Sequence, residues 1–176
     1  MNSKNKDICA ADVLSFMNRA YLLTGGNMGD REGNLAKARD LITRYCGTII
    51  ISSALYETAA WGKTDQPPFL NQALEVDTSL NAKQLLRRIL KAERTMGRIR
   101  KEKYGPRIID IDILLFNDER HNYQFLNLPH PELQNRRFAL MPLAEIAPDI
   151  IHPVLIKSIS ELLHECPDKL EVKKYS

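Results

Sequence analysis

The order of strand-like and helix-like segments between residues 20 and 116 is the feature that most constrains the fold. An apolar run is followed by a helical repeat, two β-rich segments, a second helical repeat and a final apolar strand. The predicted strands are 20–23, 48–56, 69–76 and 108–116, and the predicted helices run from Asp30 to Gly47 and from Ser79 or Asn81 to Gly97. This β-α-β-β-α-β order is typical of ferredoxin-like α+β folds. We therefore expect an antiparallel sheet with helices on one face, an appended hairpin over 117–128 and short C-terminal helices. Alternation of side chains over 69–76 predicts a half-buried strand there.

Composition favours a single globular domain. The chain has 176 residues, of which 44% are hydrophobic and 27% charged, values that exclude a disordered chain. No apolar run approaches the roughly 20 residues of a membrane-spanning helix. Cys9, Cys46 and Cys166 are odd in number and widely spaced, which predicts reduced thiols and a cytoplasmic location. We expect residues 1–18 to be a loosely ordered extension without a secretory signal, and 19–176 to be one domain, monomeric or homodimeric.

Charge is concentrated in one segment. Residues 87–107 hold nine Lys or Arg against two Glu, although the net charge of the chain is only +3. A strongly basic segment in a nearly neutral chain indicates an anionic ligand at one place. A solvated charged loop or a nucleic-acid patch would carry a similar composition. The glycines at 97 and 105 suggest a loop that closes over a ligand.

Two carboxylates follow this basic segment directly. Asp110 and Asp112 alternate with apolar residues, so both should project from one face of a strand, about 7 Å apart. The opposite face of the same predicted strand carries Ile109, Ile111, Ile113 and Leu115. Paired oxygen ligands next to guanidinium groups suit Mg²⁺ bridged to a polyphosphate. A solvated outer strand face is the alternative for an isolated D-x-D motif.

Two further groups of residues carry candidate chemistry. His130 and Arg136 are six residues apart across a predicted turn, and both can donate hydrogen bonds to phosphate oxygens. Between two prolines, the histidine could instead have a purely structural role. Trp61, Phe69 and Asn71 could stack on a planar heterocycle and bond its polar edge, or they could be ordinary core and surface residues.

Taken together, these motifs resemble the 6-hydroxymethyl-7,8-dihydropterin pyrophosphokinases of folate biosynthesis. The likeness covers residues 20–153. It rests on Gly25-Gly26-Asn27-Met28-Gly29-Asp30-Arg31, Tyr56-Glu57-Thr58, Asp65-Gln66-Pro67, Phe69-Leu70-Asn71, Glu93 with Gly97-Arg98-Ile99-Arg100, Gly105-Pro106-Arg107, Asp110-Ile111-Asp112, and Pro129-His130 with Asn135-Arg136 and Phe138. The resemblance implies transfer of a diphosphate from ATP to the hydroxymethyl group of the pterin, with release of AMP.

The resemblance also implies a role for each matching position. Asp110 and Asp112 would hold two Mg²⁺ ions, and Arg98 and Arg107 would neutralise charge on the phosphates. The implied ATP-binding residues are Glu93, Arg100, Lys101, His130 and Arg136, and the implied pterin-binding residues are Thr58, Trp61, Phe69, Asn71 and Phe138. The chain has no G-x-x-x-x-G-K-[ST] loop, so ATP would not be held in the P-loop manner.

The sequence departs from the family at a few positions. Gly26 stands where Ser is usual, which we expect to loosen the first loop, and Leu90 replaces a polar residue of the nucleotide-side helix. The basic loop is slightly shorter and has Tyr104 where Trp is frequent.

Two other functions fit parts of the sequence. An RNA-binding module would use a similar fold, but the chain lacks its K/R-G-F/Y run, and the acidic pair would repel phosphate in the absence of metal. A nucleotide sensor would bind ATP without turnover. We expect small-molecule substrates, no nucleic acid and no membrane partner.

Overall fold

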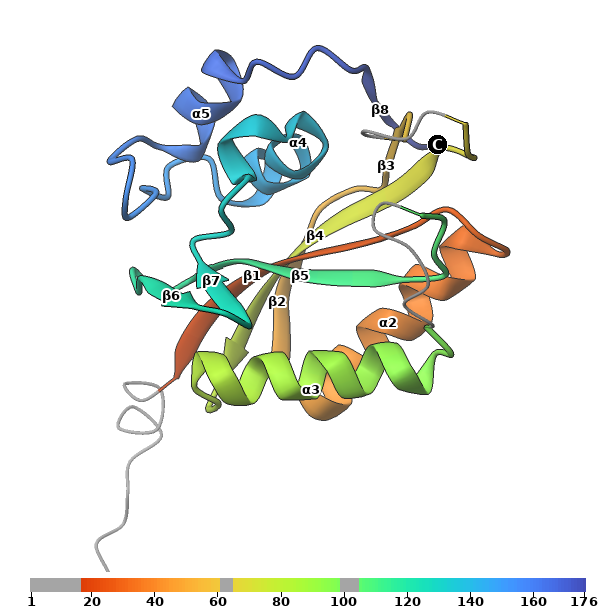
Figure 1. Cartoon of the computed structure of the whole chain (residues 1–176), viewed down its shortest axis with the longest axis horizontal. Coiled ribbons are helices and arrows are strands. Elements are labelled where there is room, and N and C mark those ends of the chain that lie inside the picture. The colour runs from red at the N-terminus through yellow and green to blue at the C-terminus, as the bar shows by residue number, and fades with distance from the viewer. Residues whose placement is uncertain (1–16, 61–64, 99–104) are drawn as a thin grey trace, which may run out of the picture.

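The computed structural model describes residues 17–60, 65–98 and 105–176. The strands are β1 Asn18–Gly26, β2 Thr48–Ser52, β3 Tyr56–Thr58, β4 Phe69–Thr78, β5 Asp110–Phe116, β6 His121–Tyr123, β7 Leu126–Leu128 and β8 Val172–Lys174. The helices are α2 Arg31–Tyr45, α3 Ala82–Thr95, α4 Arg137–Ile146 and α5 Ile159–Glu165, with a 3-10 turn η1 at Leu133–Asn135. Figure 1 shows these elements stacked as helices, sheet and helices.

The central sheet has the strand order β5-β1-β4-β3-β8, and β2 pairs with the same edge of β4 as β3 does. All of these pairings are antiparallel. The predicted ferredoxin-like α+β fold is therefore confirmed, with β5, β1, β4 and β2 as its four strands. The predicted strand 48–56 is wrong as a single element, because the chain leaves the ladder at Ser53 to Leu55 and resumes as β3.

Local sequence signals define the two central helices. Asp30 caps α2 by accepting a hydrogen bond from the backbone N–H of Gly33. Asn81 caps α3 in a reciprocal capping box with Gln84, so the choice between Ser79 and Asn81 falls on Asn81. Gly97 follows α3 with φ of 82°, a conformation that glycine adopts without strain. Both helices cover one face of the sheet, as predicted (Figure 1).

The other face of the sheet is covered by the C-terminal part of the chain. α4 and α5 pack there over a second apolar cluster that includes Tyr21, Ala73 and Leu140. The expectation of a half-buried strand at 69–76 is therefore wrong: residues 70–76 of β4 are buried on both faces. The polar side chains among them have partners, since Gln72 bonds the backbone of Ser53 and Glu75 pairs with Arg19.

The edge of the sheet at β5 contains an irregularity that sequence alternation did not reveal. The register between β1 and β5 shifts by one residue at Tyr21 and Leu22, so the side chains of β5 change faces there. Ile109, Ile111 and Ile113 contact the α2/α3 core as predicted, but Leu115 joins the opposite cluster. Both aspartates precede the shift.

The remaining elements lie at the ends of the sheet. β6 and β7 form the predicted hairpin as a separate two-stranded sheet. β8, which was not predicted, pairs with β3 and brings the C-terminus back to the sheet (Figure 1).

Cys46 and Cys166 are buried and free. Within the described ranges, no helix is long and apolar enough to cross a bilayer.

Candidate active site

The two carboxylates of β5 lie at the exposed edge of the sheet. Asp110 is opposite Gly25 and Asp112 opposite Leu23 on β1, before the register shift, so both side chains leave the same face of the strand. Their side chains are 22% and 35% exposed. The predicted pair of aspartates on one face is therefore present, and both carboxylates are partly buried.

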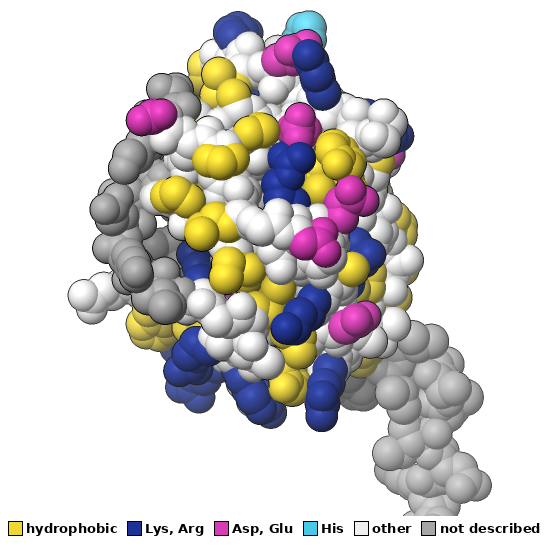
Figure 2. Space-filling view, turned by 90° about the vertical axis from the view of Figure 1, so that its right-hand side faces the viewer, with side chains coloured by type: hydrophobic (Ala, Val, Ile, Leu, Met, Phe, Trp, Pro, Cys, Tyr) yellow, Lys and Arg dark blue, Asp and Glu magenta, His cyan; other side chains and the backbone are white. Residues whose placement is uncertain are grey.

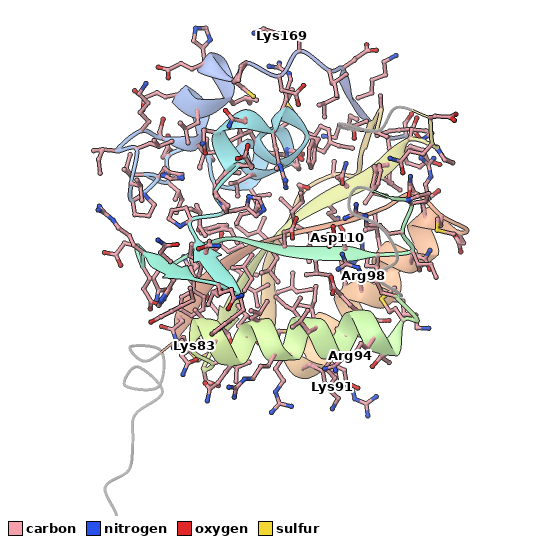
Figure 3. All side chains as sticks on the ribbon, in the orientation of Figure 1. Lys83, Lys91, Arg94, Arg98, Asp110 and Lys169 are labelled. Atoms are coloured by element: carbon pink, nitrogen blue, oxygen red, sulfur yellow. The ribbon has the colours of Figure 1, made fainter. Side chains whose placement is uncertain are left out.

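Two arginines from the basic segment contact the first carboxylate. Arg98 Nη2 lies 2.7 Å from Asp110 Oδ1, and Arg107 Nη1 bonds Asp110 Oδ2. Figure 3 shows Arg98 and Asp110 side by side between β5 and the end of α3. The side chains of both arginines are mostly buried. Two guanidinium groups are thus held at one carboxylate, with donors to spare for a second anion.

Glu93 holds the end of α3 against β5. Its side chain is 3% exposed, and its Oε1 accepts a hydrogen bond from the backbone N–H of Ile111 over 2.9 Å. The same oxygen pairs with Arg98 Nη1. Because Ile111 stands between the two aspartates on an edge strand, this carboxylate satisfies a buried donor and also orients an arginine. The contact of Glu93 with ATP that the resemblance implies stays a prediction, beside the two contacts that the structure gives this carboxylate.

His130 and Arg136 converge on the second carboxylate. Burial, and then the charge of Arg136, lower the pKa of His130 to about 4, so its ring is neutral at pH 7. His130 Nδ1 accepts a hydrogen bond from the backbone N–H of Glu132, and we therefore assign the ring proton to Nε2. Arg136 Nη1 lies 3.3 Å from this Nε2 and 3.9 Å from Asp112 Oδ2. The N–H groups of His130 Nε2 and Arg136 Nη1 therefore lie close together, and both can donate to one anionic oxygen.

In the absence of ligands, the environment of Asp112 shifts its carboxyl group toward the neutral form. Burial raises the pKa of Asp112 to about 7, and the charge of Asp110 adds to this shift, whereas Arg136 opposes it. A cation placed between the two carboxylates would relieve both effects, because it would compensate the repulsion and the lost hydration.

The described residues that were predicted to bind a planar heterocycle lie at the end of β3 and at the starts of β4 and α4. Asn71 Nδ2 donates to Thr58 Oγ1 over 3.1 Å, and both side chains are buried. Phe69 is half-buried with Arg107 5.7 Å from its ring centre, and Phe138 is half-buried with Arg136 5.8 Å from its ring centre. Each aromatic ring therefore stands beside an arginine of the phosphate side. Trp61, Arg100 and Lys101 lie outside the described residues.

Sequence reasoning did not single out Asn27 as a site residue. Its buried side chain donates to Gln66 Oε1 over 3.1 Å and to the carbonyl of Pro67 over 3.0 Å, and it accepts from the backbone N–H of Arg107 over 2.9 Å. Asn27 thus ties the segment before Phe69 to the segment that carries Arg107. The Gly-Gly-Asn turn was its only signal, since its partners are distant in sequence.

Gly26 does not loosen this region, contrary to expectation. A Cβ atom on Gly26 would lie 2.3 Å from the carbonyl oxygen of Ile108, so the missing side chain allows the two backbones to approach closely. The neighbouring backbone pair, Asn27 N to Arg107 O at 3.0 Å, holds this contact.

The two aspartates fit a magnesium site that the substrate completes. Mg²⁺ commonly takes one or two carboxylates together with phosphate oxygens and water. The residues described here contain no group of three or more His, Cys, Asp or Glu that could hold a metal alone. The donor set is therefore suited to a metal that arrives with a polyphosphate rather than to a closed structural site.

Comparisons with known proteins point to one family. The family model described as 7,8-dihydro-6-hydroxymethylpterin-pyrophosphokinase matches residues 21–148. The 2-amino-4-hydroxy-6-hydroxymethyldihydropteridine pyrophosphokinase of Aquifex aeolicus is 42% identical over 149 residues, which cover 85% of this chain and 92% of that protein. The protein of the same name from Bacillus subtilis is 43% identical over 134 residues, covering 76% and 80%.

A solved structure supports the fold independently. Wild-type HPPK-DHPS of Plasmodium falciparum superimposes with a TM-score of 0.68 at 21% identity over 85% of this chain. This chain spans 43% of that longer protein. From the family match and the identity to its relatives, the chain belongs to the 7,8-dihydro-6-hydroxymethylpterin-pyrophosphokinase family, the pyrophosphokinases of folate biosynthesis.

Proposed function

We propose that this chain carries out the ATP-dependent pyrophosphokinase reaction of its family at the exposed edge of β5. The diphosphate of ATP passes to the hydroxymethyl oxygen of 6-hydroxymethyl-7,8-dihydropterin, and AMP leaves. The observation that carries this assignment is the meeting of Arg98, Arg107 and Arg136 on the two carboxylates of one strand. Such a reaction requires positioning and charge compensation rather than a covalent nucleophile.

The phosphate chain would lie between the two basic groups. Arg98 and Arg107 approach from the end of α3 and the start of β5, whereas His130 and Arg136 approach from the other end of the two-aspartate row. The neutral His130 donates through Nε2 and adds no charge, so its contribution is orientation. The arginines offset the negative charge that develops on the bridging and leaving oxygens.

Asp110 and Asp112 would hold the magnesium that accompanies ATP. When bound, Mg²⁺ supplies Lewis-acid polarisation of the phosphates and lowers the pKa of a coordinated hydroxyl group. Asp110 has a second role in the resting protein, since its bonds to Arg98 and Arg107 hold both arginines at the place where phosphate binds.

The pterin would bind beside the phosphate site. Phe69 and Phe138 offer aromatic faces, and the Asn71 amide, held by Thr58, offers a donor and an acceptor to the polar edge of the ring. The arginines beside both rings support a position of the stacked heterocycle next to the phosphates. This proximity is what an in-line attack by the hydroxymethyl oxygen requires. The roles of Trp61, Arg100 and Lys101 remain those implied by the resemblance.

The decisive experiment measures AMP and ADP separately with ATP, magnesium and the hydroxymethyl pterin. We expect AMP to form only when all three are present. Asp112→Asn should lower turnover by about a thousandfold, because it weakens the hold on magnesium. Asp118→Asn, which changes an exposed carboxylate one turn beyond β5, is the matched control and should keep full activity. Release of ADP, or an active Asp112→Asn variant, would overturn the assignment.

A further inference from the structure

The basic segment that first indicated an anionic ligand is divided in space. Arg98 and Arg107 face the two aspartates of β5, whereas the basic residues before position 95 lie on the outer face of α3. In Figure 3, Lys91 and Arg94 lie on α3 away from Asp110, and Lys83 lies at the start of α3 beside the β6–β7 hairpin, while Arg98 and Asp110 lie between the end of α3 and β5. The active site therefore accounts for only part of the positive charge.

The outer face of α3 forms a continuous cationic stripe. Lys83, Arg87, Lys91 and Arg94 are all exposed and recur at three- and four-residue spacing, which places them on one side of the helix. At 1.5 Å per residue, the stripe is about 16 Å long. Figure 2 shows Lys and Arg side chains gathered along the lower edge of the molecule, where α2 and α3 lie.

No carboxylate neutralises this stripe in the described part of the chain. None of its four residues has an ion-pair partner there, and the only acidic residue of α3, Glu93, is buried and turned toward Arg98. Exposed helices normally interleave charges of both signs, so a stripe of one sign attracts anions from solution.

An aromatic ladder begins where the stripe ends. His121, Tyr123 and Phe125 on the β6–β7 hairpin are stacked, with ring centres 5.5 and 5.7 Å apart. Lys83 Nζ lies 4.1 Å from the centre of the Tyr123 ring, which joins the ladder to the stripe. Tyr123 is 40% exposed and Phe125 is 63% exposed. Tyr123 is the central ring and has a neighbour on both sides, so Phe125, the exposed outer ring, is the one available for further stacking.

From this juxtaposition, we propose that α3 and the β6–β7 hairpin form a binding surface for single-stranded nucleic acid, separate from the active site. Proteins that hold single strands without sequence preference combine a row of cations along the backbone with aromatic rings that stack on bases. An acidic protein would also match the stripe, but a ladder of rings beside a row of cations favours planar bases, which stack on aromatic faces. This inference differs from our expectation that no nucleic acid binds, which treated the whole basic segment as one site.

The test is fluorescence anisotropy of a labelled oligouridine with the full chain, while the active site is filled with magnesium and a non-hydrolysable ATP analogue. We expect binding that weakens with salt, with a log–log slope of about −3 for four phosphate contacts. The Arg87→Glu/Lys91→Glu double variant should bind the oligouridine more weakly. The magnitude of its salt slope should decrease by about 1.4, because two phosphate contacts are lost. The Lys169→Glu/Lys173→Glu double variant is the control, because it makes the same change of charge elsewhere. In Figure 3, Lys169 lies on the opposite side of the molecule from α3. This control variant should bind the oligouridine as the wild type does.

A second pair of variants separates nucleic acid from other polyanions. Phe125→Ala should weaken oligouridine binding by about tenfold, because it removes a stacking ring. Ile156→Ala, which shortens another exposed apolar side chain, should have no effect. All four variants should retain pyrophosphokinase activity. Three results would each overturn the proposal. The first is that the ATP analogue abolishes oligouridine binding, the second is that both double variants weaken binding equally, and the third is that Phe125→Ala binds the oligouridine with unaltered affinity.

Discussion

Glu93 offers the sharpest test of how the active site is assembled. Family resemblance implied that this side chain binds ATP, but its carboxylate is buried and already bonds Ile111 N–H and Arg98. We predict that Glu93 acts as a positioning residue: it fixes β5 between the two aspartates and holds Arg98 in place. Two substitutions distinguish these roles. Glu93→Gln keeps an acceptor for Ile111 but removes the charge, and Glu93→Ala removes both.

The contacts of Glu93 set the expected loss of stability. A hydrogen bond to a charged group contributes about 1.5–3 kcal/mol and a neutral one about 0.5–1.5 kcal/mol, so Glu93→Gln should cost about 1–2 kcal/mol. Glu93→Ala also leaves the buried Ile111 N–H unpaired, and its total cost should reach about 3–5 kcal/mol. For a chain of 176 residues, these losses correspond to decreases in Tm of about 3–6 °C and roughly 10 °C.

Kinetics then separate positioning from substrate contact. If Glu93 orients Arg98, Glu93→Gln should lower kcat by about tenfold or more and change the KM for ATP much less, because the arginine acts on charge that develops in the transition state. Melting curves and initial rates, measured well below the Tm of each variant, provide both quantities. An unchanged Tm combined with an effect confined to the KM for ATP would refute the positioning role and restore the direct contact.

Two further predictions follow from other contacts of the site. Asp112 has a folded-state pKa raised from 3.8 to about 7, so the folded protein binds more protons than the unfolded chain between these values and stability falls as pH rises through this window. In metal-free protein, Asp112→Asn should therefore raise Tm more at pH 8 than at pH 5; equal shifts at both pH values would contradict the raised pKa. Asn27→Ala removes three hydrogen bonds between the segments at Pro67 and Arg107, which should cost about 3 kcal/mol and lower kcat. Asn27→Asp keeps only the acceptor for Arg107 N–H. Chemical denaturation and initial rates measure both effects, and values equal to those of the wild type in both variants would contradict this prediction.

Local signals in the sequence were sufficient for most of the elements. Capping residues, glycines at helix ends and apolar periodicity depend on neighbours a few residues away, and they located α2, α3, β1, β4, β5 and the hairpin. The same short-range alternation placed Asp110 and Asp112 on one face of their strand. Where the periodicity was interrupted by long-range pairing, as at Ser53 and at the register shift before Leu115, the prediction failed.

What the sequence by itself determined was therefore the order of elements, the ends of the helices, the pair of aspartates and the family. Only the tertiary structure decided that α4 and α5 bury the second face of β4, that Glu93 turns inward to Arg98, and that Asn27 joins two segments. The tertiary structure also divided one run of positive charge between an active site and the outer face of α3. The physical reason is distance along the chain: the bond from Arg107 N–H to Asn27 spans 80 residues, and no periodic pattern encodes which distant groups satisfy one another.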